Sequence, residues 1–331
     1  MRYLSVCAGI EAASVAWHEL GWTPVAFSEI EKFPSAVLAH HYPTVPNWGD
    51  MTKFKEWPDE SIDVLVGGTP CQSFSVAGLR KGLVDPRGNL MLTYLAIADR
   101  YRPEWLVWEN VPGVLSSNKG KDFGTFLGGL AELGYGFAYR VLDAQHFGVA
   151  QRRRRVFVIG NSRSWQRAAA VLFERESLCG NPAPRRETKQ DVAGTFTARA
   201  NSGGWGQDVD LAAGGYMVPS TVGALTDGAH MGGGLTDKTP TQDELSRCLT
   251  GRGMRLDSET ETFVVMQSMQ VRRLTPRECE RLQGFPDDYT LIPYRNKLAS
   301  DGPRYKALGN SMAVPVMAWI GKRIQMLEDI T

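Results

Sequence analysis

Residues 62–75, with the sequence IDVLVGGTPCQSFS, decide the fold class of this chain. Ile62–Val66 is an almost unbroken apolar run, which is typical of a strand covered on both faces of a sheet. Two glycines then permit a sharp turn, and Pro70 stiffens the loop that carries Cys71. Ligands of open α/β sheets bind beyond the carboxyl ends of strands, so this loop occupies the position of a functional site. A thiol there is a candidate nucleophile, with a half-buried structural cysteine as the alternative.

Strand-like and helix-like segments alternate on both sides of this stretch. The expected strands are Tyr3–Cys7, Val25–Phe27, Trp105–Trp108 and Val156–Ile159. The expected helices are Ile10–Leu20, which Gly21 ends, Ser35–His41, Asn89–Tyr101 and Phe123–Leu133. Alternation of this kind predicts an α/β fold, with a parallel sheet between two layers of helices.

The second half of the chain has a different composition, because 13 of the 35 glycines lie between Gly194 and Gly253. This stretch repeats a short phrase (GTFTA at 194–198, GALTD at 223–227, RCLTG at 247–251), through chance similarity of turns or as a set of similar short strands. Regular patterns return with a capping box at Thr275–Glu278 and a final helix over 313–327. We therefore expect one domain over 1–165 plus about 298–331, and a smaller, irregular β-rich domain over 166–297.

The overall composition excludes several classes of protein. With 331 residues, 43% of them hydrophobic and a net charge of +1, the chain is not intrinsically disordered. No apolar run approaches the roughly 18 residues of a membrane span, and the first residues lack a secretory pattern, so a cytoplasmic protein without membrane association is expected. The five cysteines form no C-x-x-C pair, which predicts neither a disulfide framework nor a metal site. The even charge is unusual for a nucleic-acid-binding protein.

Two further motifs adjoin predicted strands. Glu109 and Asn110 follow the WLVW strand, where partial burial raises a carboxyl pKa toward neutrality and allows a hydrogen bond to a ring nitrogen. A capping or ion-paired surface glutamate is the alternative. Gln151, Arg153 and Arg155 enter the VFVI strand on one face, whereas the alternative for this basic run is a solvated surface.

The loop Cys7–Ala12 follows the first strand, at the position of a nucleotide site. Only Gly9 remains of a dinucleotide fingerprint, and no Walker sequence occurs anywhere, so little is present to hold a pyrophosphate. Glu29, at the end of the second strand, could bind a ribose diol, and Asp50 could meet an adenine amino group. These residues predict a nucleoside-bearing cofactor without a pyrophosphate.

Taken in order, these phrases resemble those of the bacterial and bacteriophage DNA (cytosine-5)-methyltransferases. The resemblance rests on P-C-Q at 70–72, E-N-V at 109–111, Q-x-R-x-R at 151–155, R-x-L-T-P-R-E at 272–278 and G-N-S at 309–311. It implies a Rossmann-like large domain that binds S-adenosyl-L-methionine, and a small target-recognition domain. It further implies methyl transfer to C5 of cytosine in a specific double-stranded DNA sequence, on a flipped-out base.

The resemblance also assigns roles. Cys71 would add to C6 of cytosine, and Glu109 would engage N3 and the exocyclic amine. Arg155 would contact O2, and Arg153 would support the site. Pro70 and Asn110, the neighbours of Cys71 and Glu109 in the P-C-Q and E-N-V phrases, are further implied catalytic-site residues. The implied cofactor-binding residues are Ala8, Gly9, Ile10, Glu29, Ile30, Asp50, Met51, Asn310 and Ser311. The chain departs from the family at Cys7, Glu11 and Ala12, in place of Phe and further glycines, and at Ile30, in place of an aromatic residue.

The expected partners are double-stranded DNA and a cognate restriction endonuclease, and the expected state is a monomer in a bacterial cell or phage-infected host. Phosphate contact is expected from Arg152–Arg155 and from Arg272, Arg273, Arg277 and Arg281. A nicotinamide-dependent dehydrogenase is a competing hypothesis, which the missing glycine fingerprint argues against. A non-catalytic DNA-binding relative and the same thiol chemistry on RNA also remain open.

Overall fold

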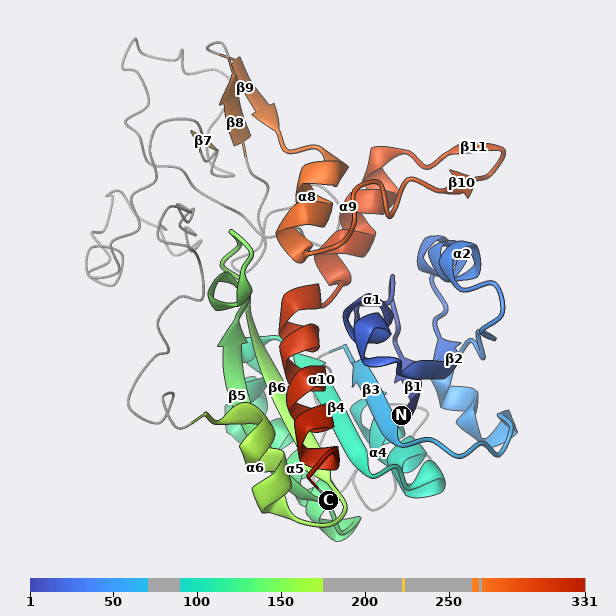
Figure 1. The fold of residues 1–331 in the computed structure, drawn as a ribbon, viewed down its shortest axis with the longest axis vertical. Coiled ribbons are helices and arrows are strands. Elements are labelled where there is room, and N and C mark those ends of the chain that lie inside the picture. Colours follow the sequence, from blue (N-terminus) through green and yellow to red (C-terminus); the bar gives the residue numbers. More distant parts are fainter. Residues whose placement is uncertain (71–89, 175–221, 224–263, 268–269, 331) are drawn as a thin grey trace, which may run out of the picture. The chain divides into compact units, whose positions relative to one another are not determined.

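The computed structural model describes residues 1–70, 90–174, 222–223, 264–267 and 270–330 (Figure 1). The chain forms two compact units. The larger comprises Met1–Leu142, Arg154–Pro182 and Val314–Thr331, and the smaller comprises Asp143–Arg153 and Ala183–Ala313. The domain boundaries expected from the sequence stay a prediction. Among the described residues, no helix is long and apolar enough to cross a membrane.

The larger unit is built on a six-stranded sheet with the order β2-β1-β3-β4-β6-β5. Its strands are β1 (Arg2–Val6), β2 (Thr23–Ser28), β3 (Val64–Gly68), β4 (Trp105–Asn110), β5 (Gly136–Asp143) and β6 (Arg154–Asn161). Strands β2, β1, β3 and β4 run parallel, so their carboxyl ends meet at one edge. The predicted strands are confirmed with small shifts of their ends, while β5, a half-buried edge strand without clear alternation, was not predicted.

The expectation of a wholly parallel sheet is wrong at β6, which pairs antiparallel with β4. Only residues 144–153 separate β5 from β6, and they include the short 3-10 helix η6 (Ala144–Phe147). A parallel return would require a crossover of about a dozen residues or more, usually with a helix. The short connection therefore favours the reversed strand.

Helices cover both faces of this sheet. The described helices of the larger unit are α1 (Ala12–Trp17), α2 (Lys32–His41), α4 (Leu90–Tyr101), α5 (Lys121–Glu132), α6 (Trp165–Leu172) and α10 (Val314–Glu328), with 3-10 helices η1 (His18–Leu20), η2 (Met51–Glu56), η4 (Pro112–Leu115) and η5 (Ser117–Gly120). Helix α10 packs on α1 and α6, whereas α4 packs on α5 at the other face of the sheet (Figure 1). Helix α6 was not predicted, because eight residues give little periodicity.

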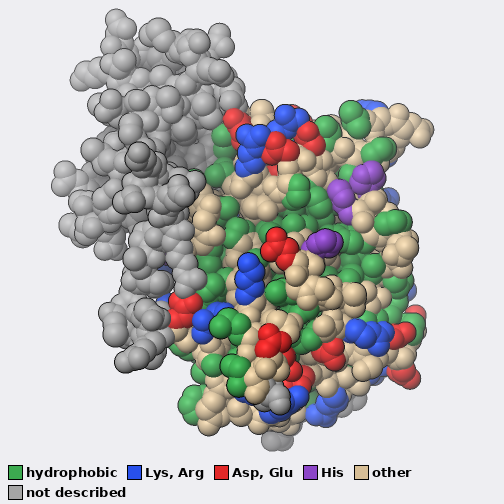
Figure 2. All heavy atoms as spheres, viewed as in Figure 1, with side chains coloured by type: hydrophobic (Ala, Val, Ile, Leu, Met, Phe, Trp, Pro, Cys, Tyr) green, Lys and Arg blue, Asp and Glu red, His purple; other side chains and the backbone are tan. Residues whose placement is uncertain are grey.

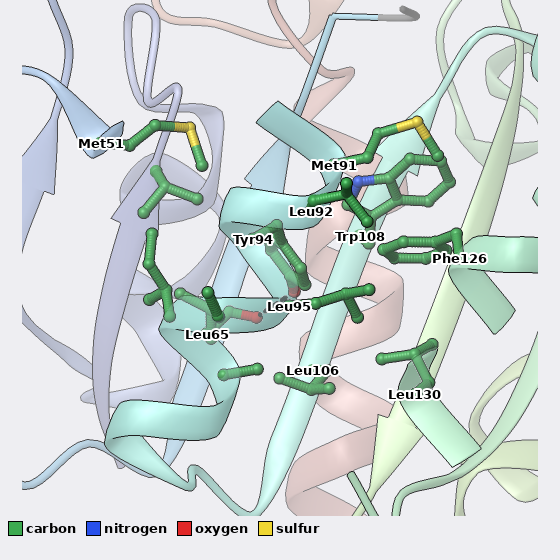
Figure 3. Close-up of a cluster of buried hydrophobic side chains, with 14 of the residues drawn as sticks. Met51, Leu65, Met91, Leu92, Tyr94, Leu95, Leu106, Trp108, Phe126 and Leu130 are labelled. Atoms are coloured by element: carbon green, nitrogen blue, oxygen red, sulfur yellow. Dashed lines mark hydrogen bonds between the residues drawn. The ribbon is translucent and has the colours of Figure 1, made fainter. Parts of the chain in front are cut away.

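The core between the sheet and helices α4 and α5 holds β4 in place (Figure 3). The side chains of β4 are buried along its whole length. The Trp108 and Phe126 rings lie 4.3 Å apart between centroids. The Tyr94 hydroxyl donates to the Leu65 carbonyl at 3.0 Å, so α4 is also fastened to β3. The strand that carries Glu109 is thus fixed by packing on both neighbours.

In addition to η6, the described residues of the smaller unit form two α-helices and several short strands. They are β7 (Val222–Gly223), β8 (Val264–Gln267), β9 (Gln270–Arg273), α8 (Pro276–Gln283), β10 (Pro293–Tyr294), β11 (Lys297–Leu298) and α9 (Asp301–Asn310). The predicted capping box is confirmed, since the Thr275 side chain accepts from Glu278 N–H and Thr275 N–H donates to the Glu278 carboxylate. Helix α9 was not predicted. The three repeated phrases lie almost entirely outside the described residues.

Candidate active site

Glu109 and Arg155, which are far apart in the sequence, form a buried ion pair. The Arg155 Nε lies 3.2 Å from Glu109 Oε1, and each side chain is about nine-tenths buried. The antiparallel register pairs Asn110 with Val156, so Arg155 enters β6 directly beside the end of β4. The guanidinium stabilises negative charge on the carboxylate, and the pair lies at the edge where the parallel strands end. The ion-paired alternative for Glu109 is thus correct about the pairing but wrong about its surface location.

The start of the Cys71 loop is anchored to β4 through Thr69. Asn110 Nδ2 donates to the Thr69 carbonyl at 2.8 Å, and Trp108 Nε1 donates to Thr69 Oγ1 at 3.0 Å. Pro70 is exposed beyond this anchor, and Cys71 itself lies outside the described residues. Sequence reasoning missed Thr69 and Trp108. The available signal was the buried tryptophan before Glu109, because a buried indole N–H requires an acceptor.

Close strand packing also explains the glycine pair before this loop. A Cβ atom on Gly67 would lie 2.5 Å from the Val6 carbonyl oxygen. Only glycine allows β3 to approach β1 this closely at that position. The end of β3, and with it Thr69, is therefore drawn tightly against the neighbouring strands.

The predicted alternation of the basic run is confirmed by burial, although β6 begins only at Arg154. Gln151, Arg153 and Arg155 are buried, Arg154 is exposed and Arg152 is half-buried. One set of side chains therefore faces the protein interior. This observation removes the alternative of a uniformly solvated basic face.

Arg153 binds the backbone of the G-N-S phrase within the smaller unit. Its Nη2 donates to the carbonyls of Gly309 at 3.0 Å and Ser311 at 2.7 Å, on either side of Asn310. Its own N–H donates to Asp143 Oδ1 at 3.0 Å. Asn310 is exposed at the end of α9, and Ser311 is buried. Arg153 thus holds the backbone around Asn310 in place.

The candidate cofactor loop is strained and acidic. Cys7, Gly9 and Glu11 all have positive φ angles (49°, 57° and 65°), although only one of them is glycine. The buried Glu11 carboxylate accepts from Ser5 Oγ at 2.8 Å and from Ser14 N–H at 3.2 Å. These bonds hold the loop to β1 and α1. Burial raises the pKa of Glu11 to about 7.

Glu29, the residue directly after β2, binds the backbone of this loop. Its Oε2 accepts from Gly9 N–H at 2.8 Å, and its Oε1 accepts from the N–H groups of Ile30 and Glu31 at 2.8 and 2.7 Å. A carboxylate offers about four lone-pair positions, so capacity for one more hydrogen bond remains. The Ile30 side chain is 70% exposed. An apolar surface therefore lies next to the predicted ribose-binding acid.

Asn47, which sequence reasoning missed, links Glu29 to the loop that carries Asp50. Its Oδ1 accepts from the N–H groups of Glu29 and Gly49, both at 3.0 Å. Asp50 is half-buried and caps η2 by accepting from Thr52 N–H at 2.9 Å. No sequence pattern distinguished Asn47 from an ordinary loop asparagine.

Two predicted cofactor residues have buried side chains. Ile10 and Met51 lie in the core, which leaves their backbone groups as the parts able to meet a ligand. The Met51 sulfur lies 3.4 Å from Cys7 Sγ. Burial, with Glu29 and Asp50 nearby, raises the pKa of Cys7 to about 12, so this thiol stays protonated and is not a competing nucleophile.

The two α8 arginines that were expected to contact phosphate are both paired with nearby aspartates. Arg281 Nε and Nη2 donate to the Asp287 carboxylate at 2.7 and 2.6 Å, and Arg277 pairs in the same way with Asp288. Figure 2 shows basic and acidic side chains interleaved over α8. These two arginines therefore contribute little net positive charge.

A family model of C-5 cytosine-specific DNA methylases matches residues 1–326. The chain belongs to this family. A protein of Escherichia phage P1, named DNA N-6-adenine-methyltransferase, is 38% identical over 97% of this chain. Type II methyltransferase M.SsoII of Shigella sonnei is 32% identical over 98% of it. The chain spans 61% of the length of the phage P1 relative and 79% of that of M.SsoII.

Among solved structures, Schizosaccharomyces pombe (S. pombe) Dnmt2 methyltransferase has a TM-score of 0.66 at 18% identity, with 100% of this chain and 99% of that chain covered. This likeness concerns the fold, and it confirms the predicted Rossmann-like α/β class. The family match confirms the predicted enzyme class, methyl transfer to C5 of cytosine in DNA.

Proposed function

We propose that this protein transfers a methyl group from S-adenosyl-L-methionine to C5 of cytosine in a specific double-stranded DNA sequence, through a covalent adduct between Cys71 and C6. The observation that carries the proposal is the buried Glu109–Arg155 pair at the carboxyl edge of the sheet. Next to it, Thr69 is held by Trp108 and Asn110 two residues before the nucleophile.

The chemistry requires a nucleophile and groups that bear charge on the ring. The Cys71 thiolate adds to C6 of the flipped-out cytosine, which gives C5 the character of an enamine carbon. In its protonated form Glu109 would donate a hydrogen bond to N3 and accept one from the exocyclic amine, and Arg155 would donate to O2, so that both groups stabilise the negative charge that develops in the ring. After C5 is methylated, loss of the C5 proton and elimination of the thiolate restore the aromatic base.

The cofactor loop suits a positively charged nucleoside better than a dinucleotide. Glu11, Glu29 and Asp50 place carboxyl groups in or beside the loop, which would repel a pyrophosphate. S-adenosyl-L-methionine, when bound, supplies an electrophilic methyl group on a sulfonium cation. Glu29 would accept a hydrogen bond from the ribose diol, Asp50 would meet the adenine amino group, and Ile30 would lie against the adenine face. The remaining contacts would come from Ala8, Gly9, Ile10, Met51, Asn310 and Ser311.

Replacement of the nucleophile tests the proposal. Cys71→Ser should abolish transfer of labelled methyl groups to DNA, while Cys248→Ser, outside the phrases that carry the resemblance, should not. The product should be 5-methylcytosine, and its identity should be read by digestion and mass spectrometry. Product found only as N6-methyladenine, the base named for the phage P1 relative, or normal turnover by Cys71→Ser would contradict the proposal.

The substrate and setting follow the family. We propose duplex DNA rather than RNA as substrate, and a monomeric enzyme in the cytoplasm of a bacterial cell or phage-infected host, paired with a cognate restriction endonuclease. Bisulfite sequencing of DNA from cells that express the protein would reveal the methylated sequence. Preferential transfer of labelled methyl groups to RNA would favour the RNA alternative instead.

A further inference from the structure

The β10–β11 hairpin of the smaller unit is a short, rigid projection. Pro293 pairs with Leu298 and Tyr294 with Lys297, so only Arg295 and Asn296 form the turn (Figure 1). The Ala299 N–H donates to the Ile292 carbonyl at 3.0 Å, and both of these side chains are buried. The hairpin is therefore fixed at its base and exposed at its tip.

The tip carries positive charge that no described acidic residue balances through an ion pair. The segment 290–300 contains two basic residues, Arg295 and Lys297, and no acidic residue. The acids on either side are already engaged: Asp287 with Arg281, Asp288 with Arg277 and Asp301 with Arg304. Over the described part of the chain, neither Arg295 nor Lys297 takes part in an ion pair. The tip thus contributes two charges to a chain whose net charge is +1.

The turn conformation makes an arginine at this position unusual. Arg295 and Asn296 have φ angles of 53° and 62°, and two positive φ angles define a type I′ turn, which favours Asn-Gly. An arginine in this conformation is held against its backbone preference. Its guanidinium lies 5.1 Å from the centroid of the Tyr294 ring, which directs it along the hairpin. Backbone strain at an exposed arginine is consistent with a functional use of its side chain.

We propose that the β10–β11 hairpin contacts the phosphate backbone of duplex DNA independently of sequence. This inference rests on the proposed function, since it assumes a duplex DNA substrate. Arginine, lysine and asparagine side chains are common donors to phosphate oxygens, and such contacts orient a protein on DNA without reading bases. A two-residue turn loses little conformational freedom on binding, so the contact is pre-organised.

The test measures how DNA affinity depends on salt. Wild-type protein and the variants Arg295→Asn/Asn296→Gly and Lys297→Gln are titrated, as full chains, onto a fluorescent 30-base-pair duplex of mixed sequence between 50 and 200 mM salt. Each lost phosphate contact should reduce the magnitude of the slope of log affinity against log salt by about 0.9. Between 50 and 200 mM salt, the factor by which a variant loses affinity should therefore be about 3.5-fold smaller than the factor for wild type. Arg295→Lys should retain the wild-type slope.

The double variant separates binding from folding, because Asn-Gly is the preferred type I′ sequence and should keep or raise the melting temperature. Lys322→Gln, an exposed lysine on α10 with a side chain 60% exposed, is the matched control and should keep the wild-type slope. Unchanged slopes in both hairpin variants would overturn the inference and leave the proposed function intact. Wild-type protein that binds duplex DNA at no salt concentration would instead contradict the proposed function, and the inference with it.

Discussion

Thr69 is the residue through which β4 holds the loop that begins at Pro70. Its hydroxyl and its carbonyl each accept a hydrogen bond from a β4 side chain. Thr69→Val keeps the shape of the side chain but leaves Trp108 Nε1 buried without an acceptor, and should lower the free energy of unfolding by about 1–3 kcal/mol. Because the loop start loses its anchor, formation of the Cys71 adduct on 5-fluorocytosine DNA should slow by about 10- to 100-fold.

The controls for this prediction are Thr69→Ser and Tyr135→Phe. The serine retains the hydroxyl acceptor and should restore most of the adduct rate. Tyr135→Phe removes a hydrogen bond from Tyr135 OH to the Pro103 carbonyl, before β4 begins, and should leave the adduct rate unchanged. A Thr69→Val variant that forms the adduct at the wild-type rate would show that the anchor does not position the nucleophile.

Glu11 should make stability depend on pH. Its folded-state pKa of about 7 lies above its ordinary value of 4.5 because of burial, so folding favours the protonated form. The contribution of protonated Glu11 to the free energy of unfolding is fully present below pH 4.5 and is lost as pH rises through about 7. Glu11→Gln cannot titrate, so its stability relative to wild type should rise by up to about 3 kcal/mol from pH 4 to pH 8. Urea unfolding at both pH values measures this, and a constant difference would argue against it.

At the scale of elements, the packing of α10 on α1 depends on Gly321. Trp17 Nε1 donates to the Met317 carbonyl at 2.8 Å, which brings the two helices together. A Cβ atom on Gly321 would lie 2.4 Å from the Trp17 ring. Gly321→Ala should therefore lower the free energy of unfolding by about 1–3 kcal/mol, measured by chemical denaturation.

Gly128 in α5 is the matched control for this helix position. A Cβ atom there would meet nothing within 4 Å. Gly128→Ala should raise stability by about 0.5–1 kcal/mol, because alanine has the higher helix propensity. Equal effects of the two substitutions would mean that the close contact with Trp17 does not decide the stability of the α1–α10 pair.

For the whole molecule, ligand binding should be visible as added stability. S-adenosyl-L-methionine at 100 times its dissociation constant should raise the free energy of unfolding by about 2.7 kcal/mol, because only the folded loop binds it. NAD should have no effect, because the carboxyl groups of the proposed cofactor loop would repel a pyrophosphate. Thermal unfolding of the full chain with each compound measures the difference. Stabilisation by NAD alone would revive the dehydrogenase hypothesis.

The sequence by itself determined where most strands and helices lie along the chain, the α8 capping box and the family. These features depend on local periodicity and on short phrases of residues, which a linear chain displays directly. It also indicated Glu109, Arg153 and Arg155 as site residues, because each lies next to a buried strand.

The tertiary structure decided which of these residues meet. The antiparallel placement of β6 puts Arg155 against Glu109, and the register of β3 on β4 lets Trp108 hold Thr69. It also decided that Arg281 is neutralised by Asp287 while the β10–β11 tip retains its charge. Strand order, register and ion pairing depend on contacts between distant segments, and local sequence does not specify those contacts.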